Sequence, residues 1–160
     1  KTLGEHQGLI YFTLGQRKGL HIGGQKDAKQ APWYVVAKDT ENQTLIVSQD
    51  KRHPFNLSDR LETLSPSWVS TPPGTRFNAF ARVRYRQSKQ ACMVTVEDNH
   101  LKIEFETPQE AVTPGQAVVL YQGNQCLGGA TIAKTNSLGG LNPYSQSLQK
   151  GHHDGTHAFN

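Results

Sequence analysis

Long hydrophobic runs are missing from this chain of 160 residues, of which only 35% are hydrophobic. No apolar run approaches the ~20 residues that a transmembrane helix needs. No charged segment followed by an apolar one resembles a secretion leader. We therefore expect no membrane partner and a cytoplasmic location. So little apolar material in a chain of this length suits one ordinary domain, or two small ones with much exposed loop.

Cysteine is also scarce, since Cys92 and Cys126 are the only two. They form no Cys-x-x-Cys pair and lack metal-ligand spacing to histidines, so the sequence predicts no zinc site and no metal-binding residue. Isolated cysteines in a glycine-rich β chain are typical of small buried hydrophobic residues. The alternative is a small thiol enzyme that uses Cys92, which requires a thiol whose pKa is depressed by the nearby arginines.

Helix signals are few. One short helical turn is predicted at residues 58–64, where Ser58 could cap and Leu61 and Leu64 fall on one face. Strand signals dominate instead, and the turn residues between them indicate antiparallel hairpins. The predicted strands are residues 9–14, 33–38, 44–48, 77–86, 92–97, 101–106, 117–122 and 129–133. The predicted fold class is therefore all-β and mainly antiparallel.

A proline-rich boundary divides the predicted strands into two modules. Residues 65–74 hold three prolines and a glycine, and Pro72-Pro73 does not fit a central strand. Residues 1–66 are expected to form a small β-rich module. Residues 70–133 are expected to form a five- or six-stranded barrel, because a sheet this small must curl to bury one face.

The C-terminal residues 134–160 differ in composition from the rest. They are rich in Ser, Gly, Asn and Gln and contain few apolar residues, which predicts a disordered tail. Three histidines in it, His152, His153 and His157, could bind adventitious metal. A solvated tail without function is the favoured interpretation.

Positive charge is unevenly placed along the chain. The net charge is +4, and residues 76–89 contain five cations and no carboxylate. Such a cluster is the usual footprint of nucleic-acid binding, although in an arbitrary protein it would more often be a solvated strand face. If residues 77–86 form a regular strand, Arg82, Arg84 and Arg86 stand on one face about 6.6 Å apart. Three arginines so placed could follow a sugar-phosphate backbone.

A second cationic segment lies in the glycine-rich residues 4–24. Gly15 and Gly19 flank the cluster Gln16-Arg17-Lys18 and predict a tight, accessible turn. Two cations on such a turn suit an anionic partner such as phosphate. The sequence leaves open whether Arg17 and Lys18 contact RNA, another protein domain or only solvent.

Four segments, taken in order, resemble the tRNA-specific 2-thiouridylase family. They are GEHQGLIYFTLGQRKGL with the following IGG, PWYVVAKD, RYRQ with Cys92, and AVTPGQAVVLYQGNQCLGG. The resemblance covers roughly residues 4–133 and implies a small β-rich central domain followed by a β-barrel like those of translation factors. The family's Ser-Gly-Gly-x-Asp-Ser-Ser nucleotide loop is absent, and neither cysteine matches a catalytic cysteine motif.

These absences predict that the chain is the C-terminal part of a longer enzyme. It opens at Lys1 rather than Met, which agrees with that interpretation. We expect no catalytic residue in this chain and no cofactor bound by it. The resemblance implies that ATP, with Mg, binds in the missing N-terminal domain of the parent enzyme.

The resemblance also implies which residues contact tRNA. The Arg-Tyr of RYRQ falls on Arg84 and Tyr85, and the Gln of TPGQ falls on Gln116. Neighbours on an ideal strand face opposite sides, so contact by both Arg84 and Tyr85 predicts that the strand ends or bulges near them. Alternation alone leaves Tyr85 either stacking on a base or filling the barrel core, and Gln116 either contacting the RNA or capping its own loop. Possible additional RNA contacts are the cations Arg82, Arg86, Arg17 and Lys18.

The resemblance implies that the parent enzyme is a transferase that catalyses ATP-dependent 2-thiolation of the wobble uridine in tRNA. A sulfur-donor relay protein is then a further partner of that enzyme. This chain is expected to bind tRNA and to be inactive by itself. The alternative is a stand-alone RNA-binding β-barrel of translation-factor type, whose natural N-terminus would lie at or near Lys1.

Overall fold

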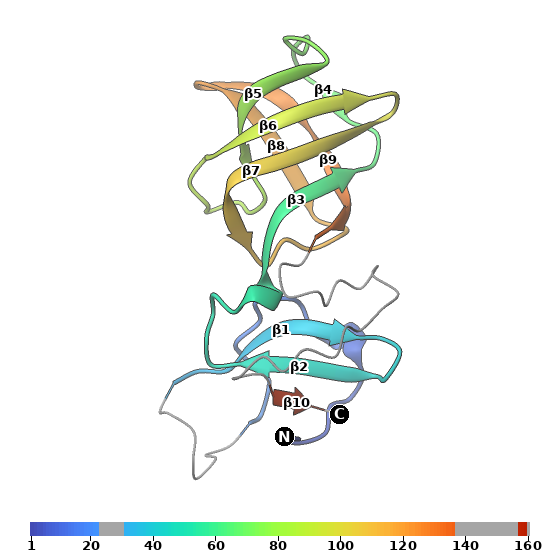
Figure 1. Ribbon diagram of the computed structural model, residues 1–160, viewed down its shortest axis with the longest axis vertical. Coiled ribbons are helices and arrows are strands. Elements are labelled where there is room, and N and C mark those ends of the chain that lie inside the picture. Colours follow the sequence, from blue (N-terminus) through green and yellow to red (C-terminus); the bar gives the residue numbers. More distant parts are fainter. Residues whose placement is uncertain (23–30, 137–156, 160) are drawn as a thin grey trace. The chain divides into compact units, whose positions relative to one another are not determined.

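The computed structural model describes residues 1–22, 31–136 and 157–159, which fold into two units (Figure 1). The first unit contains Lys1–Leu57 and the described C-terminal strand, and the second is Ser58–Asn136. The only helical elements in these ranges are two three-residue 3-10 turns, η1 (Leu9–Tyr11) and η2 (Pro54–Asn56). None of the described helices could cross a membrane. The all-β, antiparallel prediction is confirmed.

The first unit is built on a small antiparallel sheet. Its strands are β1 (Tyr34–Asp39), β2 (Thr44–Ser48) and β10 (His157–Phe159), in the order β1-β2-β10. Asp39 Oδ1 accepts hydrogen bonds from the backbone N–H groups of Glu41 and Asn42, which tightens the β1–β2 turn. Strand β10 lies within residues 134–160, where the composition predicted a disordered tail and no strand. Residues 137–156, with His152 and His153, lie outside the described residues.

The N-terminal segment of this unit is a turn rather than a strand. Leu9 and Phe12 belong to one buried hydrophobic cluster with Val35 of β1, whereas Ile10 and Tyr11 between them are exposed. Two inward side chains three residues apart fit the tight turn η1 and not a pleated strand. The predicted strand at residues 9–14 is therefore wrong.

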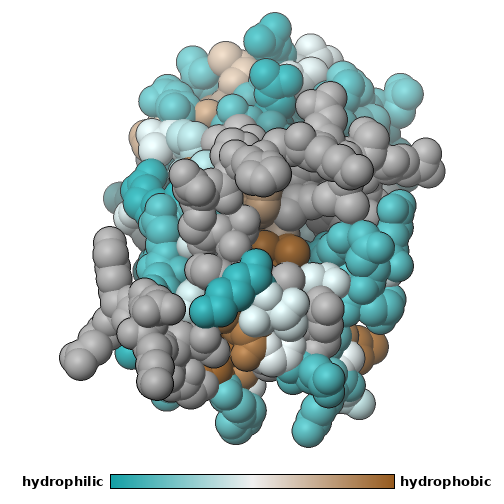
Figure 2. Space-filling model, turned by 60° about the horizontal axis from the view of Figure 1, so that its bottom comes forward, coloured by the Kyte–Doolittle hydropathy of each residue, from teal (hydrophilic) through white to brown (hydrophobic). Residues whose placement is uncertain are grey.

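Among the coloured residues of Figure 2, hydrophobic atoms form small separate patches between hydrophilic ones.

The second unit is a closed barrel of six strands (Figure 1). Around the barrel the order is β3-β7-β6-β5-β8-β9, and β9 pairs with β3 to close it. This confirms the predicted five- or six-stranded barrel. The barrel strands are β3 (Leu57–Thr63), β5 (Arg76–Arg82), β6 (Gln90–Glu97), β7 (His100–Glu110), β8 (Ala117–Gln122) and β9 (Gln125–Thr135).

The proline-rich residues 65–74 lie within this second unit, and the division between the units falls after Leu57. A two-residue strand in that segment, β4 (Ser67–Trp68), pairs with Gly129 and Gly128 of β9 outside the closed ring.

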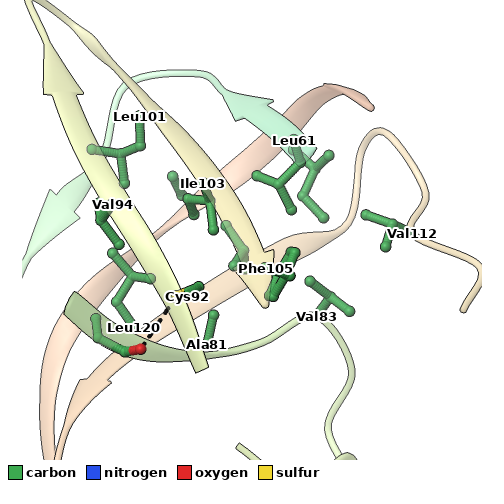
Figure 3. Packing of buried hydrophobic residues seen from close by; sticks show 14 of the residues in the cluster. Leu61, Ala81, Val83, Cys92, Val94, Leu101, Ile103, Phe105, Val112 and Leu120 are labelled. Carbon is green, nitrogen blue, oxygen red and sulfur yellow. Dashed lines mark hydrogen bonds between the residues drawn. The ribbon is translucent and has the colours of Figure 1, made fainter. Parts of the chain in front are cut away.

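Alternating inward side chains fill the barrel, as Figure 3 shows. Val94 of β6, Ile103 of β7 and Leu120 of β8 are completely buried there. Leu61 of β3 joins them, so the helical turn predicted at residues 58–64 is wrong. The i, i+3 spacing of Leu61 and Leu64 was local, whereas pairing of β3 with β9 is long-range and leaves Leu64 exposed.

Candidate nucleic-acid interface

The first part of the candidate site is the loop of residues 83–89 between β5 and β6. Strand β5 ends at Arg82, so Arg84 and Tyr85 lie in a turn. This is the irregularity that contact by both residues requires. It also means that Arg82, Arg84 and Arg86 do not stand on one strand face, so the predicted regular row of arginines is wrong.

A chain of side-chain amides fixes the shape of this loop. Gln87 Oε1 accepts a hydrogen bond from Val83 N at 3.0 Å, and Gln87 Nε2 donates to Gln109 Oε1 at 2.6 Å. Gln109, only 4% exposed, donates in turn to Thr107 O and to Gln90 Oε1. A buried amide whose donors and acceptor are paired has one preferred orientation. The buried Gln109 amide therefore fixes Gln87, and Gln87 in turn fixes the backbone of the loop at Val83.

Sequence reasoning missed the roles of Gln87 and Gln109. A signal for Gln109 existed in the alternation of residues 101, 103 and 105, which are buried. Continued along β7, that alternation places residue 109 on the inward face, where an amide must find partners, although Thr107 between them is exposed.

The second part of the site is the loop of residues 111–116 between β7 and β8. Arg84 Nη2 donates a hydrogen bond to Ala111 O at 3.0 Å, which joins the two loops at one end of the barrel. Thr113 Oγ1 donates to the same carbonyl at 3.1 Å. Ala111 has a φ of 50°, a left-handed conformation that costs an alanine energy and is retained where surrounding contacts enforce it.

Tyr85 and Gln116 project from these loops. Tyr85 is 94% exposed, so the alternative in which it fills the barrel core is wrong. Gln116 uses its backbone to hold its loop: its N–H donates to Thr113 O, and its carbonyl accepts from Ile132 N at 2.8 Å. Its side-chain amide is exposed and makes no hydrogen bond with any described residue. The amide therefore does not cap the loop, and it can donate and accept outward.

The charge of this end is not neutralised within the described part of the chain. No ion pair there involves any of the five cations of residues 76–89. Arg84 and Arg86 are exposed, and the single hydrogen bond from Arg84 leaves most of its five donors available. Arg82 is half-buried on the outer wall, with Cζ 5.4 Å from the centre of the Tyr121 ring. A guanidinium without a carboxylate partner favours an anionic ligand.

Arg17 and Lys18 belong to the first unit, on the turn that the sequence predicted. The Gln16 amide shapes the turn, because its Oε1 accepts from Thr13 N at 2.9 Å and its Nε2 donates to Lys18 O at 3.0 Å. Backbone bonds between Gln16 and Val35 and between Gly15 and Val35 tie the turn to β1. Both cations are exposed on it.

Cys92 is unsuited to thiol chemistry. It is 3% exposed in the barrel core, and its Sγ donates a weak hydrogen bond to Ala79 O at 3.5 Å (Figure 3). Burial, together with the charge of Glu106, raises the pKa of the Cys92 thiol to about 12. The thiol-enzyme alternative needed a depressed pKa, so it is wrong for Cys92.

The described residues also offer no cradle for a metal ion or a nucleotide. No three His, Cys, Asp or Glu side chains gather there in an arrangement that could hold a metal. Nucleotide phosphates are commonly held by a glycine loop at the N-terminus of a helix, and the described elements include only the two short 3-10 turns. The described residues therefore form neither of these two arrangements.

Comparison with known proteins gives consistent matches along the chain. Residues 1–49 match the domain described as the tRNA methyl transferase PRC-barrel domain, and residues 58–132 match the aminomethyltransferase β-barrel domain. The chain is 50% identical over 139 residues to the tRNA-specific 2-thiouridylase MnmA of Xanthomonas axonopodis pv. citri, which is 86% of this chain and 37% of that relative.

The protein of the same name from Nitrosococcus oceani is 47% identical over 139 residues, again 86% of this chain and 38% of the relative. The chain thus spans less than two fifths of the length of the curated relatives it matches. Two domain models match the chain in sequence order, and about half of the residues aligned with the relatives are identical. The chain therefore belongs to the tRNA-specific 2-thiouridylase family.

Proposed function

We propose that this chain is the tRNA-binding part of an enzyme that performs ATP-dependent 2-thiolation of the wobble uridine in tRNA. The observation that carries the proposal is the join between two loops at one end of the barrel. There the Arg84 guanidinium, bonded to Ala111 O, sits between the exposed ring of Tyr85 and the loop that carries Gln116.

Each of these residues suits a different part of an RNA. The planar guanidinium of Arg84 can hold a phosphate through two hydrogen bonds. Tyr85 offers a ring for stacking on a base and a hydroxyl for a sugar or phosphate oxygen. Gln116 can donate to and accept from a ribose or a base edge. Arg82, Arg86 and, from the first unit, Arg17 and Lys18 add charge that favours a polyanion.

The chemical steps belong to residues outside this chain. ATP with Mg, the catalytic cysteines and the site that receives sulfur from a relay protein are assigned to the remainder of the parent enzyme, in the cytoplasm. The chain described here orients the tRNA so that the target uridine, taken out of its stack, reaches that active site. By itself it has no thiolation activity.

The experiment that tests the proposal measures tRNA binding by the 160-residue chain at several salt concentrations. Arg84→Ala is expected to weaken binding by about 1–3 kcal/mol, and to reduce the slope of log affinity against log salt by about one. Gln116→Ala is expected to weaken binding less, because it removes a neutral hydrogen bond.

The matched control is Arg60→Ala, since Arg60 is an exposed arginine of the same barrel whose Nε lies 3.6 Å from Glu104 Oε1. It should leave the affinity nearly unchanged. Equal affinities for the wild type, Arg84→Ala and Arg60→Ala would contradict the proposal.

A further inference from the structure

The outer wall of the barrel carries an aromatic pair that the fold does not need. Phe80 of β5 lies directly opposite Tyr121 of β8 in the antiparallel register. On its other side Phe80 faces Ala91 of β6, which has only a small side chain. Phe80 is 41% exposed. Its neighbours in sequence, Ala79 and Ala81, supply the inward contacts of this strand, so Phe80 adds nothing to the barrel core.

Two cations approach the same aromatic pair. Arg82 Cζ lies 5.4 Å, and Lys89 Nζ 4.8 Å, from the centre of the Tyr121 ring. Lys89 Nζ is oriented by hydrogen bonds to Gly123 O at 2.6 Å and to Asn124 Oδ1 at 3.3 Å. Arg82 Nε is shielded from solvent and has no hydrogen-bond partner among the described residues. Phe80, Arg82, Lys89, Ala91 and Tyr121 are called the Phe80 wall below.

Such a surface is costly if it binds nothing. It exposes a large ring to water and leaves a shielded guanidinium donor unpaired, and both raise the free energy of the folded protein. Val69 and Leu64 are also exposed on this barrel, but neither side chain offers an aromatic ring. The combination of an open ring, two cations and no ion pair to a carboxylate is complementary to an anionic, aromatic ligand.

We propose that the Phe80 wall binds an unpaired nucleotide of the RNA, with the base stacked on Phe80 and the adjoining phosphate held by Arg82 and Lys89. The inference rests on the proposed function and adds a second contact surface to it. Phe80 and Arg82 are same-face neighbours about 6.6 Å apart, and Arg82 directly precedes the loop with Arg84 and Tyr85. One RNA strand can therefore pass from the barrel end onto the Phe80 wall.

The test uses the 160-residue chain and compares the ring with its surroundings. Phe80→Leu keeps an apolar side chain but removes the stacking surface, and it should weaken binding of a tRNA transcript about tenfold. Phe80→Trp keeps a ring, so it should retain the affinity, and its indole fluorescence should change when RNA is added. Val69→Ala, at an exposed apolar position of the same barrel, is the control that should have no effect.

Charge and ligand class are tested separately. Lys89→Gln should reduce the salt slope of tRNA binding by about one, whereas Lys89→Arg should restore it. A short unstructured oligouridine should compete with tRNA for the wild type better than a blunt duplex RNA of equal length. Phe80→Leu should remove this preference, because a base within a duplex has no free face to stack on the ring.

The outcomes separate this inference from the proposed function. If Phe80→Leu binds as the wild type does while Arg84→Ala is weakened, the Phe80 wall is not an RNA site and the proposed function stands. Sedimentation that shows self-association abolished by Phe80→Leu, with unchanged RNA affinity, would also overturn the inference, because the wall would then bind a second copy of the chain. A wild type without measurable affinity for tRNA or oligouridine would overturn both.

Discussion

The two ends of strand β6 differ in whether the cations beside them have a carboxylate partner. The last residue of β6 is Glu97, whose carboxylate lies 2.8 Å from Lys102 Nζ and 3.4 Å from His100 Nε2, so the cations at that end have a carboxylate partner. Before its first residue, the loop with Arg84 and Arg86 carries no carboxylate, and Arg84 donates to a backbone carbonyl instead. A count of cations does not separate the two ends, whereas the presence of a carboxylate within reach does.

This difference decides which end can bind an anion. At the Glu97 end a phosphate would have to displace an internal carboxylate, whose hydrogen bond with Lys102 raises the pKa of that lysine. At the Arg84 end a phosphate would meet guanidinium donors that have not been neutralised, so binding requires no exchange of ion pairs. The following experiments break or sharpen this contrast.

The largest effect is expected on the reactivity of a thiol between these two ends, that of Cys92 in β6. Its pKa is raised to about 12 from an ordinary value of 9.0, so at about pH 8 its thiolate fraction should be roughly a thousandfold lower than in the unfolded chain. Labelling by a thiol reagent, followed by mass spectrometry on a Cys126→Ser variant, measures the rate. Above pH 9 the unfolded chain loses a proton that the folded chain keeps, so the free energy of unfolding should fall as the pH rises.

Labelling of folded Cys92 at the unfolded rate would show that the strand between the two ends is open. The half-buried Cys126 in the wild type serves as the reference for an accessible thiol of the same barrel.

The next largest effect is expected on the stability of the barrel, at Gly128 of β9. It has a φ of 149°, and an added Cβ would overlap Ser67 O and lie 2.9 Å from Trp68 Cα of β4. Gly128→Ala should therefore lower the free energy of unfolding by about 2–4 kcal/mol, as measured by denaturant titration. Gly74→Ala is the control, because nothing lies within 4 Å of its added Cβ. Similar stabilities of the two variants would contradict the close approach of β4 to β9.

A smaller effect, confined to the Arg84 end, is expected for Gln87→Ala. It leaves Val83 N and the buried Gln109 Oε1 without their partner, which should cost about 1–3 kcal/mol of stability. The loop should also lose its fixed shape, so the tRNA affinity of the folded fraction should fall. Gln125→Ala removes one exposed hydrogen bond, to Ser70 Oγ, and should change neither quantity appreciably. A destabilised Gln87→Ala variant with unchanged affinity would separate the loop from RNA binding.

The fold was predictable where its determinants are local. The β1–β2 hairpin and the hairpin of β6 with β7 follow from alternating apolar residues around polar turns, and both were predicted. Strand β3 was not, because the spacing of Leu61 and Leu64 fits a helical turn equally well. Its pairing with β7 and with β9, the latter about 70 residues later in the sequence, decides in favour of a strand.

The candidate site was predictable in part for the same reason. The motif resemblance indicated Arg84, Tyr85 and Gln116, and local geometry required the strand to end near the first two. Their joining through Ala111 O depends on a barrel that brings residues 84 and 111 together, which no local pattern specifies. The pairing of Phe80 with Tyr121 is likewise a matter of strand order.

The smallest effect should follow Glu97→Gln, at the other end of β6. The hydrogen bond from Lys102 lowers the pKa of Glu97 below its ordinary 4.5, and the same bond raises the pKa of Lys102 above 10.5. The wild type should keep this contribution to stability between those values and lose it as the pH falls through the lowered pKa of Glu97. Glu97→Gln should lack that acid-side loss, which thermal melting at about pH 7 and about pH 3 would reveal. Because both groups are exposed, the difference should be small.

The affinity of the Glu97→Gln variant for tRNA at neutral pH should stay unchanged, since freeing Lys102 adds a cation far along the strand from the Arg84 loop. A gain in affinity comparable to the loss caused by Arg84→Ala would show that the two ends of β6 act on one RNA, and the contrast between them would fail.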